Sequence, residues 1–144
     1  MQAAYGHVDR AIEIAKVSGP ESYVSHYLNT KAECAAKMGR LDEAHQFASE
    51  ALAVAERTAN PRAAAGARVV LADVARQRGL RDESISRLEE AAAGYRLLDA
   101  RRELGDVLMR LSAVAKERGD SETAQRYAEQ AYEATKATSG LMGR

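Results

Sequence analysis

The stretch NTKAECAAKMGRLDEAHQFASEAL at residues 29–52 recurs as VVLADVARQRGLRDESISRLEEAA at 69–92 and as MRLSAVAKERGDSETAQRYAEQAY at 109–132. Each copy contains a glycine, and these glycines are 40 residues apart: Gly39, Gly79 and Gly119. Small residues keep four further registers around the glycine: Ala32, Ala72 and Ser112; Ala35, Ala75 and Ala115; Ala44, Ser84 and Ala124; Ala51, Ala91 and Ala131. Self-similarity at a fixed period indicates a repeat protein.

Apolar and small residues follow helical spacing on both sides of each glycine, as Leu41, Ala44 and Ala48 do after the first. A glycine between two amphipathic helices permits a left-handed backbone and a tight reversal. Alanine and serine at the facing positions let the two helix axes approach closely. One such hairpin cannot bury its own apolar face, so neighbouring hairpins must stack.

These motifs resemble the tetratricopeptide repeat. The similarity lies in the small–x–x–small pattern of the first helix, the G-x-x-x-x-A turn and the A-x-x-x-(A/L)-x-x-A second helix, over roughly residues 22–137. It implies an all-α, right-handed superhelix (an α-solenoid) of antiparallel helix hairpins. The chain departs from the common form in its period, 40 residues instead of about 34, and it has no tryptophan. Long repeats of this kind are similar to those of bacterial regulators, including quorum-sensing peptide receptors and signal-transduction ATPases.

The predicted domain is single and spans residues 1–144. Ser18-Gly19-Pro20, Asn60-Pro61 and the stretch 98–101 mark the junctions between units. The expected units are a half-repeat at 6–18, repeats at 21–58, 61–98 and 101–137, and a frayed tail at 138–144. The half-repeat follows from GHVDRAIEIA at 6–15, which matches GRLDEAHQFA at 39–48.

The two ends of this array are expected to lack the polar caps that helical solenoids use. The helix at 8–17 has no partner before it, and Tyr127 and Tyr132 are expected on an uncovered face of the last repeat. Either the chain is a piece of a longer protein, which we favour, or its ends are buried in a homodimer.

Composition excludes several classes of function. Lys plus Arg and Asp plus Glu number 21 each, so no net field selects nucleic acid or an anionic membrane. No apolar run approaches the length of a membrane span. The single cysteine, Cys34, excludes an internal disulfide and fits a reducing cytoplasm. Cys34 itself is expected to be a small core residue.

Catalytic and metal-binding patterns are not found in the sequence. The three histidines are 19 residues apart, and none pairs with Cys or His at the spacing that metal sites use. Carboxylates that follow the turns, as in GLRDES, suit helix N-termini as caps. We therefore expect a non-enzymatic protein with no metal and no cofactor.

The family resemblance implies that the first helices of the repeats line a binding groove. The groove positions are His26, Asn29, Glu33, Lys37, Val69, Val70, Asp73, Arg76, Met109, Arg110, Ala113 and Lys116. The family's chaperone-tail clamp needs basic and amide residues at five positions, of which only Arg110 is present here. An apolar middle with charges of both signs is suited to an extended peptide or a partner helix.

The sequence therefore predicts a cytoplasmic protein- or peptide-binding module, part of a larger bacterial regulator and possibly self-associating. The alternative is the peptide-sensing C-terminal domain of a helix-turn-helix transcription regulator. Neither interpretation involves direct contact with nucleic acid or membrane by this domain.

Overall fold

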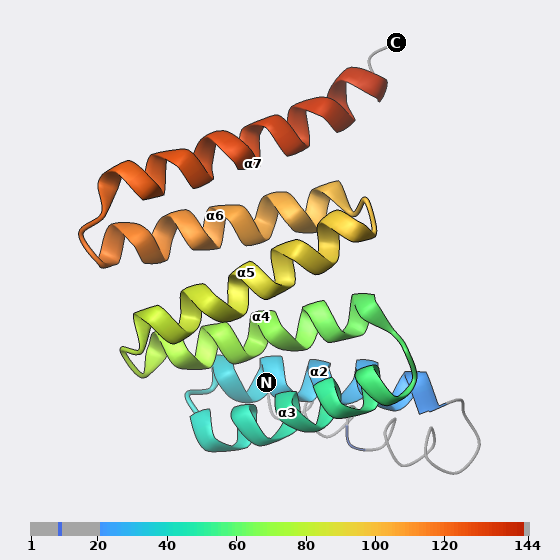
Figure 1. The fold of residues 1–144 in the computed structure, drawn as a ribbon. Helices are drawn as coiled ribbons and strands as arrows, with labels where there is room; N and C mark the ends of the chain where they lie inside the picture. The colour runs from blue at the N-terminus through green and yellow to red at the C-terminus, as the bar shows by residue number, and fades with distance from the viewer. Residues whose placement is uncertain (1–8, 10–20, 143–144) are drawn as a thin grey trace.

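The structure, a computed structural model of the 144-residue chain, describes residue 9 and residues 21–142. These residues form α-helices and no strand, and each helix packs antiparallel to the one before it (Figure 1). The helices are α2 (Glu21–Lys37), α3 (Leu41–Arg57), α4 (Pro61–Gln77), α5 (Arg81–Leu97), α6 (Arg101–Glu117) and α7 (Ser121–Met142). The predicted all-helical class is confirmed.

The turns within the pairs α2–α3, α4–α5 and α6–α7 depend on glycine, as the sequence predicts. Gly39, Gly79 and Gly119 have φ angles of 77°, 81° and 87°. In each turn the N–H of the residue after the glycine donates to a carbonyl of the preceding helix. The N–H of Leu80, for example, donates to the carbonyl of Ala75 at 2.8 Å. This bond satisfies a carbonyl that the end of a helix leaves without a partner.

The turns between the pairs have the same left-handed geometry without a glycine, which the sequence analysis did not foresee. Ala59 has a φ of 52° and Asp99 a φ of 54°. The N–H of Asn60 donates to the carbonyl of Ala55 at 2.8 Å, so the hydrogen bond of the glycine turns is kept. Asn60 also caps α4, because its side chain accepts from the N–H of Ala63 at 3.2 Å. Pro61 is the first residue of α4, where a proline costs no hydrogen bond.

Small residues lie where the helices of a pair meet. Ala32 and Ala44 are fully buried in the first pair. A serine occupies one side of the equivalent contact in the next two pairs. Ser84 donates to the carbonyl of Ala72 at 2.9 Å, and Ser112 donates to that of Ala124 at 2.7 Å. Each buried hydroxyl is therefore satisfied by the backbone of the facing helix.

The stack is less tight in its middle than at its N-terminal side. α2 packs directly against α4, whereas α4 and α6 approach each other less closely. In Figure 1, α5 lies between α4 and α6. The largest hydrophobic cluster fills this region with side chains of α5 and α6, among them Leu88, Tyr95, Leu108 and Leu111.

The C-terminal helix runs into the segment for which the sequence predicts a frayed tail. A frayed tail is expected from residue 138, yet α7 continues to Met142. No proline interrupts it, and the hydroxyl of Thr135 donates to the carbonyl of Ala131 at 3.1 Å.

Tyr127 was expected on an uncovered face, and this is wrong. Its ring packs against the largest core cluster, and its hydroxyl donates to Glu89 of α5 at 2.8 Å. Burial and this bond raise the pKa of Tyr127 to about 12. Tyr132 is 62% exposed, as predicted, but most of its exposed neighbours on α7 are polar.

Two further expectations concern the ends of the chain. The predicted half-repeat at 6–18 lies outside the described residues except for Asp9, whose carboxylate pairs with Lys31 of α2. The homodimer stays a prediction. None of the helices in the described part of the chain has the length and apolar character needed to cross a bilayer.

We predict that replacing Ala72 or Ala115 by Leu destabilises the protein by about 1–3 kcal/mol, because each is 1% exposed at a helix contact and has no room for three more carbons. Thermal unfolding measures the effect. Ala53→Leu on the exposed side of α3 is the matched control, and an unchanged melting temperature in both core variants would contradict the register.

We predict that Ala59→Gly stabilises the protein by about 0.5–1 kcal/mol. A left-handed backbone costs a residue with a Cβ about 1–2 kcal/mol, and the greater freedom of glycine in the unfolded chain offsets part of the gain. Gly79→Ala, the reverse change in a matched turn, should destabilise. Chemical denaturation of both variants is the measurement, and shifts of the same sign would contradict this account.

Candidate functional site

The predicted groove residues lie on α2, α4 and α6, the first helix of each pair. Six are exposed: His26, Glu33, Lys37, Met109, Arg110 and Lys116. Five are partly buried: Asn29, Val69, Asp73, Arg76 and Ala113. Val70 was expected to be an accessible apolar anchor, but it is only 4% exposed and packs in a core cluster with Leu71. Val69 is the more exposed of the two adjacent valines.

A hollow of about 170 Å³ brings part of this set together across the three helices. We call it the α2–α4–α6 hollow. Its lining residues are Glu33, Ala36, Lys37, Val69, Val70, Asp73 and Arg110. Ala36, which is not among the predicted groove residues, is 3% exposed and belongs to a core cluster, as its position in the apolar spacing of α2 indicates. The hollow therefore has apolar side chains from α2 and α4 and charged groups from all three helices.

The remaining predicted residues are not part of this lining. His26 stacks edge-on against Tyr27, with ring centroids 5.5 Å apart. Arg76 lines only a narrower recess, next to Val69, Asp73 and Arg110. Asn29, Met109, Ala113 and Lys116 line neither space.

Ion pairs join α4 to α6. Arg62 pairs with Glu103, and Arg76 pairs with Glu117. Each pair links residues 41 positions apart in the sequence. Because α4 and α6 approach less closely than α2 and α4, long side chains make the connection between them.

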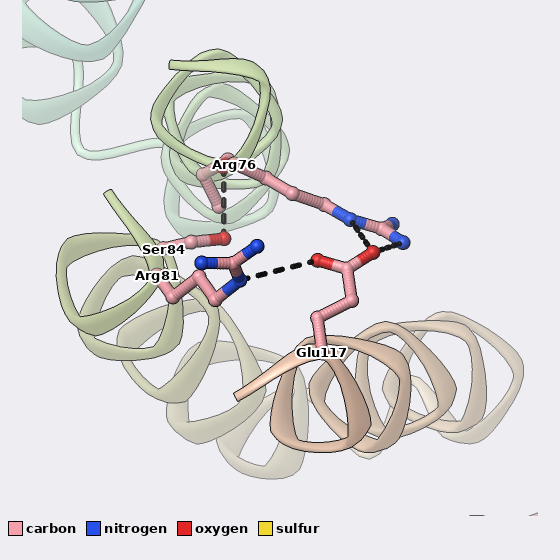
Figure 2. A network of polar contacts seen from close by, with 5 residues as sticks. Arg76, Arg81, Ser84 and Glu117 are labelled. Atoms are coloured by element: carbon pink, nitrogen blue, oxygen red, sulfur yellow. Dashed lines mark hydrogen bonds and ion pairs between the residues drawn. The ribbon is translucent and has the colours of Figure 1, made fainter. Parts of the chain in front are cut away.

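Glu117 is shared between two arginines. The Nε of Arg76 donates to one carboxylate oxygen at 3.0 Å, and the Nε of Arg81 lies 3.9 Å from the other (Figure 2). The hydrogen bond from Arg76 lowers the pKa of Glu117, and the same bond raises the pKa of Arg76. Glu117 therefore holds the guanidinium of Arg76, which is one of the predicted groove residues.

Arg110 differs from the other groove arginine. It lines the hollow beside Asp73, but it makes no hydrogen bond or ion pair with any residue that the structure describes. Lys37, on the α2 side of the same hollow, likewise has no such partner among these residues. The two cations therefore keep all of their donors available.

Tyr95 of α5 is a residue near this face that the sequence analysis did not find. A Cβ placed on Gly66 of α4 would lie 3.9 Å from the Tyr95 hydroxyl and 3.2 Å from the Asn29 side-chain nitrogen. Glycine at position 66 thus avoids a tight contact with the Asn29 side chain, while the Tyr95 hydroxyl lies at an ordinary contact distance. Burial raises the pKa of Tyr95, and nearby Glu103 raises it further. The signal in the sequence is the glycine itself, since His26 and Asp106 occupy the equivalent positions.

A second hollow, of about 400 Å³, lies among α5, α6 and α7. It is lined by Arg96, Leu104, Leu108, Arg126, Glu129, Gln130 and Glu133. Forty residues earlier, Arg68 takes the place of Leu108 and lies within ion-pair distance of both Glu56 and Glu90, at 3.7 and 3.5 Å. Leu108 has a shorter side chain than the arginine at the equivalent position 68, which leaves space in this hollow.

Reactive groups do not gather at either hollow. The described residues contain no set of three His, Cys, Asp or Glu side chains placed to hold a metal ion. Cys34, expected in the core, is partly exposed, although Val74 and Val114 at its register are buried.

Comparison with known proteins gives a structural neighbour. No family model matches the chain, and no curated protein matches it. The fold is similar to that in the crystal structure of BtubC (BKLC) from P. vanneervenii, with a TM-score of 0.80, 21% sequence identity and coverage of 94% of this chain. The match covers 57% of the BtubC chain, so this chain spans little more than half of its length. At this identity the similarity concerns the fold alone.

We predict that Glu117→Gln destabilises the protein at neutral pH by about 0.2–1 kcal/mol, a small effect because the carboxylate is 35% exposed. The folded-state pKa of Glu117 is below its ordinary value of 4.5, so its contribution is present above pH 4.5 and is lost as pH falls through the lowered pKa. Urea unfolding as a function of pH should show the two proteins converging in acid. Glu133→Gln is the control, and a difference that persists in acid would contradict the assignment.

Proposed function

We propose that this chain is a non-enzymatic, tetratricopeptide-like interaction module that binds an extended peptide or a partner segment across α2, α4 and α6. In this proposal its helix pairs are three repeats of a right-handed superhelix, preceded by a half-repeat. It would act in the cytoplasm as part of a bacterial regulatory protein. The 40-residue period of the glycine turns and small contacts supports the family assignment.

The observation that carries the proposal is the α2–α4–α6 hollow. It crosses three helices, so a segment lying in it contacts all three helix pairs at once. A cavity of about 150 Å³ can hold a benzene molecule, so a hollow of 170 Å³ is large enough for one apolar side chain. Charges surround the apolar surface of Val69, which is the arrangement of an anchor pocket with a polar rim.

Selection of a random 12-residue peptide library on the purified protein tests this function. We expect Val69→Lys to weaken the selected peptides at least about tenfold, because a long charged side chain would occupy the hollow. Fluorescence anisotropy with a labelled peptide gives the affinities. Circular dichroism and thermal unfolding check that the variant remains folded.

The control is Ala53→Lys, which adds the same charge to an exposed position on α3, outside the hollow. Equal affinity for the wild type and Val69→Lys would place binding elsewhere and overturn the proposal. Failure to select any peptide would overturn it as well.

A further inference from the structure

The surface around the second hollow, of about 400 Å³ among α5, α6 and α7, has features that the proposed function does not use. We call this space the α5–α6–α7 hollow. Most of its surface is apolar; Leu104 is partly exposed there, whereas Leu108 is only 1% exposed. A cavity of about 150 Å³ can hold a benzene molecule, so the hollow has room for a leucine side chain.

Forty residues earlier, the corresponding surface compensates its own charges. Arg68 of α4 lies there between α3 and α5, within ion-pair distance of both Glu56 and Glu90. At the α5–α6–α7 hollow these two glutamates are replaced by Arg96 and Gln130. The ion pairs of the earlier unit therefore cannot form at this hollow.

Four charged side chains line the hollow, and none of them makes an ion pair with another described residue: Arg96, Arg126, Glu129 and Glu133. The hydrogen bonds that they make are to uncharged side chains; Arg96, for example, donates to Gln130 at 3.2 Å. Two positive and two negative groups cancel, so net charge selects no ligand here. A surface with both signs can instead be complementary to a second copy of itself, because a two-fold rotation can place the arginines of one copy opposite the glutamates of the other.

α5 also presents a leucine to solvent next to this lining. Leu97 directly follows Arg96 and is 90% exposed, and the residue forty positions earlier is Arg57. A single exposed leucine needs no explanation by itself. This one, however, follows a residue of a hollow that is large enough to receive its side chain. The surface thus carries both a protruding apolar side chain and a space for one, which is what an isologous contact requires.

We propose that a second copy of this chain docks on this surface and forms a two-fold symmetric dimer. Leu97 of each copy enters the α5–α6–α7 hollow of the other and contacts Leu104. The charged lining residues pair across the two-fold axis, arginine with glutamate. The two hollows share no lining residue, so this inference does not depend on the proposed function.

Sedimentation velocity of the 144-residue protein over a range of concentrations tests the dimer. The wild type should dimerise reversibly at high micromolar concentration. Leu97→Arg introduces the residue found at position 57 and should weaken the dimer at least about tenfold, because a charged side chain would have to enter an apolar space. Circular dichroism and thermal unfolding check that the variant remains folded.

Two matched controls make the same kind of change outside the hollow. Leu80→Arg replaces another exposed leucine, and Tyr132→Arg replaces the exposed tyrosine of α7. Both should dimerise like the wild type. Tyr132→Arg also distinguishes this dimer from the expected association through the ends of the array.

Reciprocal charge reversal tests the pairing across the two-fold axis. An acidic variant carries Arg96→Glu and Arg126→Glu, and a basic variant carries Glu129→Arg and Glu133→Arg. Each variant alone should be monomeric, because four like charges would face four more across the axis. An equimolar mixture of the two should form a heterodimer, since an acidic lining then faces a basic one.

The proposal is overturned if the wild type stays monomeric throughout the concentration range, or if Leu97→Arg dimerises as well as the wild type does. It is also overturned if Leu80→Arg or Tyr132→Arg weakens the dimer as much as Leu97→Arg. Folded acidic and basic variants that remain monomeric when mixed would overturn it as well.

Discussion

The close contact between the two helices of each pair is the constraint on which the rest of the structure depends. Ala32 of α2 and Ala44 of α3 are fully buried, and their small side chains let the two helices pack closely. In the later pairs a serine takes one side of the contact, and its hydroxyl bonds to the facing carbonyl. Because these contacts set the separation of the axes, they also determine which side chains project from α2, α4 and α6.

The connection between the helix pairs is of another kind, and it shapes the candidate site. α2 and α4 touch directly, whereas α4 and α6 are joined by Arg62 with Glu103 and by Arg76 with Glu117. Exposed ion pairs contribute little to stability, so the largest core cluster provides most of the cohesion there. The ion pairs instead fix the positions of Arg76 and Glu117 and leave Arg110 without a partner among the described residues.

The sequence predicts the turns and the small contacts because both depend on local rules. Gly39, Gly79 and Gly119 adopt the left-handed backbone that their spacing indicates. The sequence cannot predict whether Val69 or Val70 is accessible, because both positions fit the edge of an apolar stripe. Tyr127 was assigned to an uncovered face for the same reason: at the edge of an apolar stripe, a shift of one position decides whether a side chain faces the core or the solvent. The ion pair of Arg76 with Glu117 could not be predicted, because the two residues are 41 positions apart and meet only once the helices are placed.

Comparison between equivalent positions separates the residues that maintain the fold from those that differentiate the surface. Positions 32, 72 and 112 are all small and all buried, as the contact between helices demands. Positions 30, 70 and 110, two residues earlier, carry Thr, Val and Arg, so the repeat imposes no common chemistry there. Val70 joins the core between α2 and α4, whereas Arg110 lines the hollow where α6 lies farther from α4. Because α6 lies farther from α4 than α4 does from α2, position 110 can carry a charged side chain where position 70 must be apolar. The charge of Arg110 is therefore available to a partner.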